Sequence, residues 1–569
     1  MAKYIIVSGG VLSGVGKGIA TASIGKILSE YGYKVTAIKI DPYINFDAGT
    51  LRPTEHGEVW VTNDGGEIDQ DLGSYERFLG IDIPKSNNIT TGQVYKAIID
   101  RERNGEYLGE TVQFIPHVPE EIKNRIKKAS QDYDITLIEI GGTIGDYENV
   151  PFLFTAKSME RELGKENVVY VLITYLPIPT HIGEMKTKPT QQAIKLLQEQ
   201  GIMPDIILCR GKEPLDDVRK KKIETYANIQ RELVISAPDI KILYEVPINF
   251  EREQLGLKIL SKLNLQPKKK PDWKEWEIAL NRLKASEIVR IAMVGKYVDI
   301  GAFTFKDAYV SINEALEHSG ARVGLKAKID WVDSKTLEDK DPAEVLKNYD
   351  GLIIPGGFGA TGIEGKISAI KYARETGTPF LGLCLGAQLA VVEYARNVAG
   401  LKDAHSIEIN PKTPYPVVDL LPTQKELLAK SSYGGTMRLG AYAAVIKPDT
   451  FVYKLYRKEN RIVEDMKQKL SEESLGEVKN FEYVIERHRH RYEISPKFHE
   501  ILEKAGLVFS GYHQRQDGTK LVEFIELPKH PFFVGTQAHP EFRSRFLNPA
   551  PLFIGFMEAV KKYIEKRVE

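Results

Sequence analysis

Along the chain, short runs of consecutive apolar residues alternate with segments whose apolar residues recur at a helical spacing. Runs that favour buried strands lie at residues 3–10, 34–41, 134–140, 167–179, 204–210, 288–297, 350–355 and 378–384. Segments with helical spacing lie at residues 17–32, 183–201 and 389–400. Strands that alternate with helices in this way predict an α/β fold with parallel sheets. No apolar run approaches the roughly 18 residues that a membrane span requires.

The length and one charged segment predict two domains joined by a linker. The 569 residues exceed one ordinary domain. Residues 267–271 are charged and bounded by prolines, which break helices. Asp272 can then cap a helix in which four large apolar residues share one face: Trp273, Trp276, Leu280 and Leu283. We therefore expect an N-terminal domain, a linker and a C-terminal domain at residues 1–266, 267–287 and 288–569.

Composition excludes several classes of protein. Hydrophobic residues make up 42% of the chain and charged residues 27%, as in globular proteins. The 78 basic and 78 acidic residues cancel, so no overall field attracts nucleic acid or an anionic membrane, and we expect neither as a partner. Only two cysteines occur, Cys209 and Cys384, which fits the reducing cytoplasm where we expect the protein. Lys17 and several glycines interrupt the apolar N-terminal stretch, so we expect no signal peptide.

A strand that ends in a glycine-flanked cysteine is the central feature of the C-terminal half. The run TPFLGLC leads through Cys384 into the helical segment 389–400, so a tight turn with the cysteine on it is predicted. Gly382 and Gly386 leave room around the sulfur. The positive end of the helix dipole favours the reactive thiolate. Cys384 is thus a candidate nucleophile, and the alternative is a small buried core residue.

Two further stretches supply partners for such a nucleophile. In AHPEF, His539 and Glu541 are two residues apart, so in an extended segment both side chains leave on the same side. The carboxylate can then orient an imidazole that serves the cysteine as base and acid. Residues 355–359, PGGFG, follow an apolar strand and offer amide N–H groups to an oxyanion. From Ile288 to the C-terminus, this combination resembles the triad glutaminase of class I glutamine amidotransferases, which releases ammonia for another site.

The N-terminal half begins with a strand, a glycine-rich loop and a helix. This arrangement predicts a phosphate cradle in which amide N–H groups and Lys17 meet a polyphosphate, the alternative being a merely flexible turn. The loop has five residues between Gly10 and Gly16, and Gly18 stands where a Ser or Thr usually contacts magnesium. We therefore expect carboxylates elsewhere to hold the metal.

Two carboxylates are candidates for that metal. Asp71 lies in an acidic cluster with Asp69 and Glu76, and Glu139 ends a buried strand. The carboxyl ends of strands in open α/β sheets form the usual ligand crevice. The alternative is that each is a solvated surface acid.

Three other features invite chemical interpretations that we set aside. Cys209 lies inside an apolar strand and is expected to be core. His488 and His490 have no neighbouring cysteine or second acidic pair, so a metal site is not expected there. Residues 456–483 carry charges of both signs with apolar residues four apart, which predicts a solvated amphipathic helix, with a partner contact as the alternative.

Seven longer strings identify a family over nearly the full length. In order they are SGGVLSGVGKGI, DPYINFD, HGEVWVTNDGGEIDQDLGSYERF, IGGTIGDYEN, GEMKTKPTQ, GGTMRLG and ERHRHRYE. Together with the cysteine turn they resemble the CTP synthase family. The resemblance implies a doubly wound P-loop domain similar to dethiobiotin synthetase, followed by a class I glutaminase α/β domain. It also implies ATP-dependent amination of UTP to CTP through a 4-phosphorylated intermediate, with glutamine as the ammonia source and Mg²⁺ as cofactor.

The resemblance assigns residues in the N-terminal domain. Those matching the ATP site are Gly14, Val15, Gly16, Lys17, Gly18, Ile19, Asp71, Asp239 and Ile240. Those matching the Mg²⁺ site are Asp71 and Glu139, with Lys39 as a second cation at the reacting oxygens. Those matching the site shared by UTP and CTP are Ser13, Lys186, Thr187, Lys188, Pro189, Thr190, Gln191 and Lys222. Those matching the segment used by CTP as feedback inhibitor are Asp146, Tyr147 and Glu148.

In the C-terminal domain the resemblance makes Cys384, His539 and Glu541 the catalytic triad. Residues matching the glutamine site are Gly357, Leu385, Gly386, Ala387, Gln388, Glu408 and Arg491, of which Gly357 and Leu385 receive the oxyanion. The resemblance also implies a homotetramer with nucleotide sites at subunit interfaces, an internal ammonia tunnel, and activation by GTP. Many members carry an aromatic residue and an arginine after PGGFG, whereas this chain has Ala360 and Thr361.

Three alternatives remain to be separated by experiment. An adenylating amidotransferase such as GMP synthetase has a loop close to SGGVLS, but here Leu12 replaces an aspartate and the glutaminase is C-terminal. Cobyrinic acid diamide synthases share the domain order but are expected to lack GEMKTKPTQ and DPYINFD. A catalytically dead scaffold is the third, and the intact triad and phosphate loop argue against it.

Overall fold

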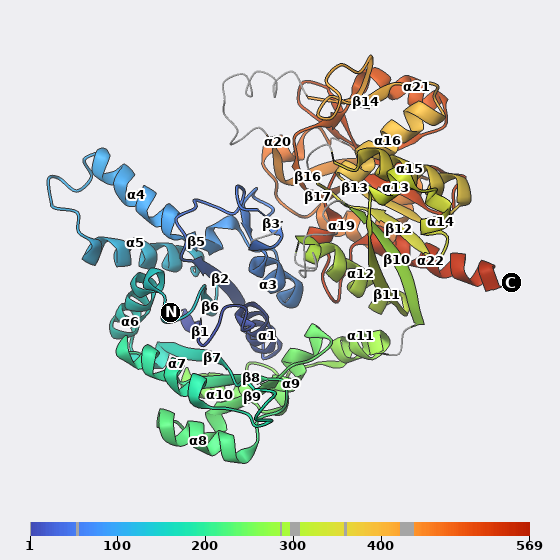
Figure 1. Ribbon diagram of the computed structural model, residues 1–569. Helices are drawn as coiled ribbons and strands as arrows, with labels where there is room; N and C mark the ends of the chain where they lie inside the picture. The colour runs from blue at the N-terminus through green and yellow to red at the C-terminus, as the bar shows by residue number, and fades with distance from the viewer. Residues whose placement is uncertain are drawn as a thin grey trace. The chain divides into compact units, whose positions relative to one another are not determined.

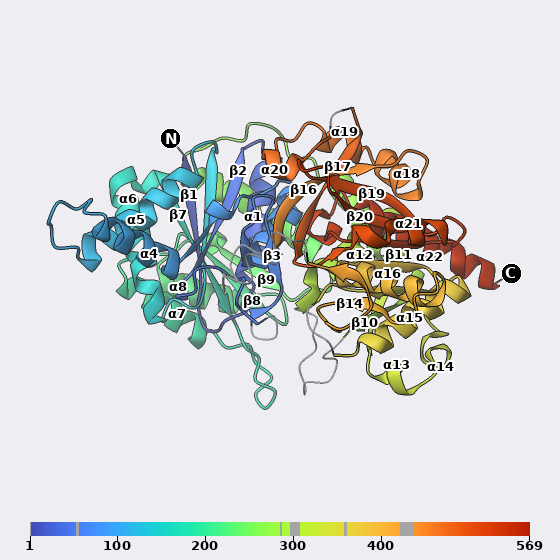
Figure 2. The ribbon, with the colours of Figure 1, turned by 90° about the horizontal axis from the view of Figure 1, so that it is seen from above.

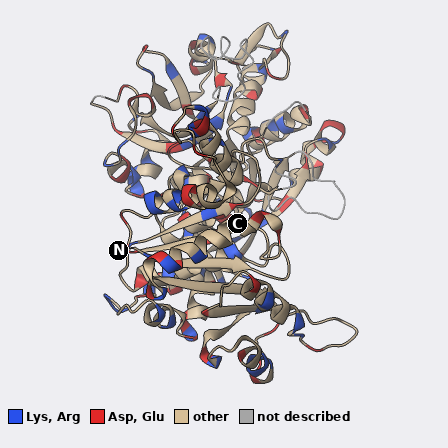
Figure 3. Cartoon of the chain, turned by 90° about the vertical axis from the view of Figure 1, so that its left-hand side faces the viewer, with Lys and Arg blue, Asp and Glu red and all other residues tan. Residues whose placement is uncertain are grey.

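The computed structural model describes residues 2–52, 56–284, 287–295, 308–357, 361–420, 437–478 and 480–568 (Figure 1). They form two compact units, the first from Met1–Trp60 and Glu67–Glu277 and the second from Val61–Gly66 and Ile278–Glu569. Within these ranges, no helix combines the length and apolar character that a bilayer crossing requires. Basic and acidic residues are interspersed over both units, in line with the zero net charge (Figure 3).

The first unit is built on a seven-stranded sheet in the order β5-β2-β6-β1-β7-β8-β9, in which all neighbours are parallel. Its strands are β1 (Lys3–Gly9), β2 (Val35–Asp41), β5 (Asn88–Thr90), β6 (Ile135–Ile140), β7 (Val168–Tyr175), β8 (Ile206–Gly211) and β9 (Val234–Pro238), and a separate ribbon pairs β3 (Val59–Val61) with β4 (Glu67–Asp69). The strands are apolar along their length because both faces of the sheet are covered. Since β2 and β6 lie on one side of β1 and β7 and β8 on the other, the loop after β1 opens at the position where ligands bind in such sheets.

Helices cover both faces of this sheet. They are α1 (Lys17–Glu30), α3 (Asp71–Leu79), α4 (Thr91–Arg103), α5 (Phe114–Ala129), α6 (Val150–Leu163), α7 (Lys188–Glu199), α8 (Asp217–Ala227), α9 (Val246–Arg252) and α10 (Leu255–Lys262). The next helix, α11 (Lys274–Lys284), begins in the first unit and ends in the second. Tyr4 and Ile6 of β1 pack with residues of α4 to α8, whereas α1 lies on the other side, as Figure 2 shows. The predicted doubly wound α/β fold is confirmed.

The second unit contains a nine-stranded sheet in the order β11-β10-β12-β13-β21-β20-β19-β16-β17 and a three-stranded sheet β14-β15-β18. Its strands are β10 (Glu287–Gly295), β11 (Leu325–Asp333), β12 (Gly351–Ile354), β13 (Phe380–Leu383), β14 (Ala404–Ser406), β15 (Tyr415–Asp419), β16 (Arg438–Ile446), β17 (Tyr483–His490), β18 (Glu493–Ile494), β19 (Val508–Gln514), β20 (Lys520–Glu526) and β21 (Phe533–Thr536). The large sheet is parallel from β11 to β21 and antiparallel from β21 to β17.

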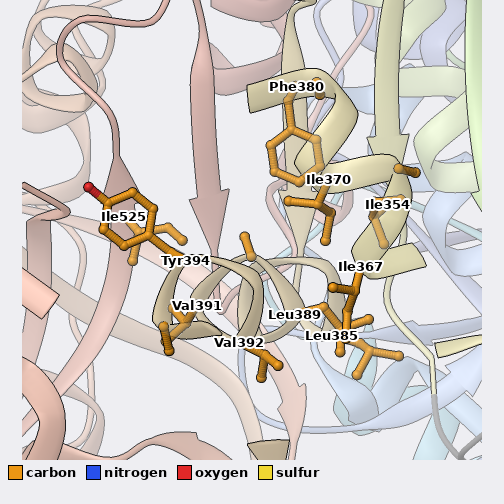
Figure 4. Packing of buried hydrophobic residues seen from close by; sticks show 14 of the residues in the cluster. Ile354, Ile367, Ile370, Phe380, Leu385, Leu389, Val391, Val392, Tyr394 and Ile525 are labelled. Carbon is orange, nitrogen blue, oxygen red and sulfur yellow. The ribbon is translucent and has the colours of Figure 1, made fainter. Parts of the chain in front are cut away.

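Helices again cover both faces of the nine-stranded sheet. They are α12 (Val310–Val323), α13 (Thr336–Asp339), α14 (Pro342–Leu346), α15 (Ile363–Thr376), α16 (Leu385–Asn397), α18 (Phe451–Lys458), α19 (Arg461–Asp465), α20 (Glu472–Leu475), α21 (His499–Lys504) and α22 (Pro551–Val568). Ile354 of β12 packs with Ile367 and Ile370 of α15 and Leu389 of α16 (Figure 4). The preceding Ile353 packs on the opposite face with α12 and α22, as alternating strand residues must. This fixes α16, which follows Cys384, against the centre of the sheet.

The domain boundaries remain a prediction, but the helix after the linker and residues Val61–Gly66 are relevant to them. Lys274 N–H donates to the Asp272 side chain at 3.1 Å, and Trp276 is buried on α11, as the expected capped helix requires. Residues Val61–Gly66 belong to the second unit because Arg487 donates to Asn63 Oδ1 at 2.6 Å and to the Val61 carbonyl at 3.0 Å. No local pattern in the sequence indicated this.

The predicted solvated helix at residues 456–483 is wrong. Three short helices, α18, α19 and α20, cover parts of this segment, and Asn460 between the first two adopts a left-handed conformation with φ of 58°. Asp465 at the end of α19 is fully buried, where its carboxylate accepts from Arg543 and from the Ile485 N–H, each at 2.8 Å. The charges that suggested a solvated face therefore belong partly to a buried ion pair.

Candidate active sites

Cys384 lies on a strained turn between β13 and α16. It occupies the N-cap of α16 with φ of 50° and ψ of −102°, a conformation that typically costs about 1–3 kcal/mol. Its N–H donates to the Thr536 carbonyl at 2.7 Å, which holds the turn against β21. A Cβ on Gly386 would stand 2.2 Å from the Ile354 carbonyl, so only glycine permits this approach of α16 to β12. The sheet thus presents the sulfur at the start of a helix, as predicted.

His539 and Glu541 form a buried pair beside Cys384. His539 Nδ1 lies 2.7 Å from Glu541 Oε1, and its backbone N–H donates to the Arg487 carbonyl at 2.8 Å. Burial alone would lower the pKa of His539, but Glu541 and the Cys384 side chain outweigh burial and raise that pKa to about 10. A Cβ on Gly356 would lie 2.8 Å from His539 Cε1 and 3.5 Å from Cys384 Cβ, so this glycine fits closely against both. Such an arrangement can hold a thiolate next to an imidazolium.

The other residues expected to bind glutamine lie around the same turn. Four of them form the first turn of α16: Leu385, Gly386, Ala387 and Gln388. Gln388 Nε2 donates to the Tyr492 carbonyl at 2.9 Å. Burial and the charge of Glu408 raise the pKa of Tyr492, and Arg491 opposes them, so both charges lie close to this ring. Gly357 lies next to Gly356 on the loop that follows β12, whereas Phe358 and Gly359 lie outside the described residues.

In the first unit the glycine loop leads into α1 as expected. Gly14 and Gly16 have φ of 70° and 89°, so the loop uses the left-handed conformations that favour glycine. Lys17 is buried, donates to the Gly142 carbonyl at 2.7 Å, and has its pKa lowered chiefly by that burial. Ser13 and Gly14 are exposed. The loop therefore brings a lysine and exposed backbone to the carboxyl end of β1.

The two metal candidates converge on one cation. Lys39 Nζ donates to Asp71 and, at 3.1 Å, to Glu139 Oε1, while the Tyr75 hydroxyl donates to the other Glu139 oxygen. Burial disfavours a charged Lys39, but Asp71 and Glu139 outweigh it and hold its pKa well above the usual value. Burial raises the pKa of Glu139, whereas Lys39 overcomes burial at Asp71 and lowers the pKa there. The interpretation of Glu139 as a solvated acid is wrong, since it is 1% exposed.

Asp71 also explains the missing Ser or Thr after Lys17. A Cβ on Gly18 would lie 2.1 Å from Asp71 Oδ1, so the carboxylate occupies the space of the absent side chain. Mg²⁺ bound with a nucleotide usually takes one or two carboxylates, its other ligands being waters and phosphate oxygens. The residues present therefore fit this metal.

We expect Gly18→Ser to abolish most of the CTP synthesis that the resemblance implies, because the added side chain must displace Asp71. A displacement of this size near reacting groups can cost about 100-fold in rate. The measurement is CTP formation from ammonium at saturating ATP and UTP. Glutamine hydrolysis by the same protein should stay near wild type. Normal CTP synthesis by the variant would show that synthesis does not depend on the position of the Asp71 carboxylate beside Gly18.

A pocket opens beside the glycine loop, with Gly16 among its lining residues. Its apolar lining includes Ile19, Ala20, Leu208, Pro238, Ile240 and Phe250. Arg210 flanks the pocket, donating to the Val15 carbonyl at 3.2 Å and pairing with Asp239. Of the residues expected to bind ATP, Ile240 thus lines an apolar pocket next to the phosphate loop, and Asp239 pairs with Arg210 at the same pocket.

The residues expected to bind UTP and CTP lie on two helices and three loops, one of which is the glycine loop with Ser13. Lys188, Pro189, Thr190 and Gln191 begin α7, Lys186 and Thr187 precede it, and Lys222 is exposed on α8. Asp146 accepts from the Thr143 N–H and hydroxyl at 2.6 and 2.9 Å, so it holds its turn. Tyr147 and Glu148 follow it and are exposed.

Comparison with known proteins decides the family. A family model described as "CTP synthase N-terminus" matches residues 3–265, and one described as "Glutamine amidotransferase class-I" matches residues 304–559. The chain is 50% identical to "CTP synthase" of Pyrococcus furiosus over 568 residues, covering 100% of this chain and 99% of that one. The chain belongs to the CTP synthase family.

Two more relatives illustrate the match. "CTP synthase" of Methanocaldococcus jannaschii is 50% identical over 565 residues, covering 98% of both chains. A solved structure titled "Trypanosoma brucei CTPS - glutaminase domain with bound acivicin" is 34% identical, covers 48% of this chain and 94% of its own, and gives a TM-score of 0.40. CTP synthases act on ATP, UTP and glutamine, so the two sites described above are where such substrates are to be sought.

Two residues at the sites, Gln537 and Tyr75, were not predicted from the sequence. Gln537 Nε2 lies 3.7 Å from Cys384 Sγ, and in TQAHPEF it precedes His539 by the same two-residue step that separates His539 from Glu541. That spacing could have revealed it. Tyr75, which donates to Glu139, lies 64 residues from it in sequence and gave no local signal.

The features set aside earlier have structural roles. Cys209 is buried in β8, where burial raises the pKa of its thiol to about 12, so its assignment to the core is confirmed. His488 Nδ1 lies 3.1 Å from His490 Nε2, and burial holds the pKa of both rings well below the usual value. Arg438 lies in the same cluster, where it donates to Glu523 at 2.7 Å.

Proposed function

We propose that this chain is a glutamine-hydrolysing ligase that forms CTP from UTP, ATP and ammonia. Two observations together support it: a cysteine, histidine and glutamate relay in the second unit, and a lysine and carboxylate cluster behind a phosphate loop in the first. Full-length similarity to CTP synthases supports the combination.

In the second unit Cys384 attacks the glutamine side-chain carbonyl. The N–H groups of Gly357 and Leu385 receive the oxyanion, and His539, oriented by Glu541, gives its proton to the leaving ammonia. Gln388, Glu408 and Arg491 hold the substrate, with the guanidinium on its carboxylate. Ammonia must stay neutral to act as a nucleophile, so we propose that it travels through an internal passage rather than through water.

In the first unit the ATP γ-phosphoryl group is transferred to O4 of UTP. This turns a poor leaving group into phosphate, which ammonia displaces at C4. Lys17 contacts the ATP phosphates, and Lys39 stands at the reacting oxygens. Asp71 and Glu139 would hold Mg²⁺, which when bound supplies positive charge to offset the charge that develops on the transferred group.

One mixture tests the proposal. UTP, ATP, Mg²⁺ and glutamine incubated with the protein should yield CTP, ADP, phosphate and glutamate. Release of AMP instead of ADP would favour an adenylating amidotransferase, and independence of UTP would favour a diamide synthase. Absence of glutaminase activity would favour a scaffold. We further propose a cytoplasmic homotetramer that acts on small molecules, which the family resemblance supports.

We propose that CTP inhibits the enzyme at residues 146–148, and Glu148→Lys should then raise the CTP concentration needed for inhibition while changing the use of UTP much less. Glu148 is the better choice than Asp146, since Asp146 holds its own turn. Titration of synthesis against CTP gives the inhibitory concentration, with Asp132→Lys as a matched exposed control. Wild-type sensitivity in Glu148→Lys would contradict the assignment.

We propose that GTP activates glutamine hydrolysis, but at higher concentration than in members with an arginine after PGGFG. Thr361 is exposed, and Ala360 lies outside the described residues. A hydrogen bond to a charged group is worth about 1.5–3 kcal/mol, so its loss weakens binding about 10- to 150-fold. Ala360→Tyr with Thr361→Arg should lower the half-activating GTP concentration. An unchanged value would show that GTP is held elsewhere.

A further inference from the structure

A row of side-chain amides leads to the sulfur of Cys384. Gln537 Nε2 lies 3.7 Å from Cys384 Sγ, and Gln537 Oε1 accepts from Gln388 Nε2 at 3.1 Å. The same Gln388 nitrogen donates to the Tyr492 carbonyl at 2.9 Å. Gln537 is 1% exposed and Gln388 3%, so neither amide can exchange its partners freely with water. The row joins the end of β21, the first turn of α16 and the segment between β17 and β18.

The chemistry of the groups fixes the direction of this row. A backbone carbonyl only accepts hydrogen bonds, so Gln388 must turn its NH₂ group toward Tyr492. His490 Nδ1 lies 3.1 Å from the same carbonyl, whose two lone pairs can accept from both groups. The second hydrogen on Gln388 Nε2 then points to the Gln537 side chain, so the acceptor there must be Gln537 Oε1. Gln537 is left with its NH₂ group facing the sulfur, since turning either amide over would bring like groups together.

We propose that Gln537 is a further catalytic residue, whose amide N–H donates to Cys384 Sγ and favours the thiolate over the thiol. Gln388 is then a positioning residue that fixes the direction of the Gln537 amide. A hydrogen bond to the charged form of a group stabilises that form. The thiolate is the form that attacks, and it forms again when the acyl group leaves, so the donor serves both halves of glutamine hydrolysis. The inference rests on the proposed role of Cys384 as nucleophile.

The test is the pH dependence of Cys384 alkylation by iodoacetamide, because thiolate reacts and thiol does not. Mass spectrometry of the Cys384 peptide separates it from Cys209. Gln537→Leu replaces the amide with an apolar side chain of similar size that has no donor, and should raise the alkylation midpoint by about one pH unit. The kcat for glutamine hydrolysis should fall about 10-fold or more with little change in KM. Gln514→Leu removes a glutamine elsewhere in the second unit and should leave the midpoint unchanged.

Gln537→Glu gives a second, independent measurement. It preserves the acceptor for Gln388 but places a negative charge where the donor was, so the midpoint should rise further than in Gln537→Leu. CTP formation from ammonium should remain near wild type in both variants, which monitors folding. A midpoint equal to that of wild type in a variant that retains this activity overturns the inference. Complete alkylation of the wild type should abolish glutamine hydrolysis, and if it does not, the proposed nucleophile itself is wrong.

Discussion

Cys384→Ala is expected to abolish CTP formation with glutamine while leaving formation from added ammonium at high pH nearly intact. Loss of the nucleophile of a hydrolytic triad lowers the rate by at least about 10³-fold. Cys384 lies on the turn between β13 and α16 of the second unit, whereas the phosphate loop and its carboxylates lie in the first. The measurement is CTP formation with each nitrogen source.

The chain offers a matched control for this variant. Cys209 is its only other cysteine, buried in β8 of the first unit. Cys209→Ala should retain synthesis from both nitrogen sources. Equal loss of both activities in a folded Cys384→Ala protein would mean that the two roles are not separated between the units.

Structural features that depend on residues close together in the sequence could be predicted. The turn at Cys384 follows from one apolar run, two glycines and one helical segment, all within residues 378–400. The strand, glycine loop and α1 are equally local, and the alternation of strands and helices was sufficient to predict an α/β fold with parallel sheets. Asp71 and Glu139 are 68 residues apart in sequence and converge on Lys39. Glu139 could be proposed because it ends a strand of a parallel sheet, and Asp71 because it lies in an acidic cluster.

Features that depend on distant partners could not be predicted. The charges around Asp465 predicted a solvated face because the sequence does not show that Arg543 reaches the same place. Residues 61–66 join the second unit through Arg487, which lies more than 400 residues away. The direction of the Gln537 amide depends on Gln388 and on a backbone carbonyl, and no residue pattern encodes that geometry. These are tertiary contacts between side chains of ordinary type.

Asp71→Asn and Glu139→Gln are expected to remove CTP synthesis from either nitrogen source while basal glutamine hydrolysis survives. Both carboxylates converge on Lys39 next to the phosphate loop, and each replacement removes a negative charge that we propose holds Mg²⁺. Loss of charge stabilisation at a transferred group typically costs about 100-fold or more. The measurement is CTP formation from ammonium and from glutamine, with glutamate release as the control.

A second readout separates lost metal binding from lost chemistry. Mg²⁺ with ATP should raise the midpoint of thermal unfolding of the wild-type protein, and should raise it less in both variants. Breaking a buried ion pair can itself cost about 3–5 kcal/mol, so stability without ligands must be measured first. Glu139→Gln preserves an oxygen that can accept from Tyr75, which favours folding of this variant.

Glu251→Gln is the matched control within the first unit. This carboxylate accepts from the Tyr31 hydroxyl at 2.9 Å and from the Gly256 N–H at 3.0 Å, but contacts no part of the phosphate loop in these bonds. Its replacement should leave both synthesis and the Mg²⁺-dependent rise in unfolding temperature unchanged. Near-normal synthesis in both Asp71→Asn and Glu139→Gln would mean that other residues hold the metal. The carboxylates would then serve chiefly to keep Lys39 charged, since Asp71 and Glu139 are the two largest of four carboxylate interactions that raise its pKa.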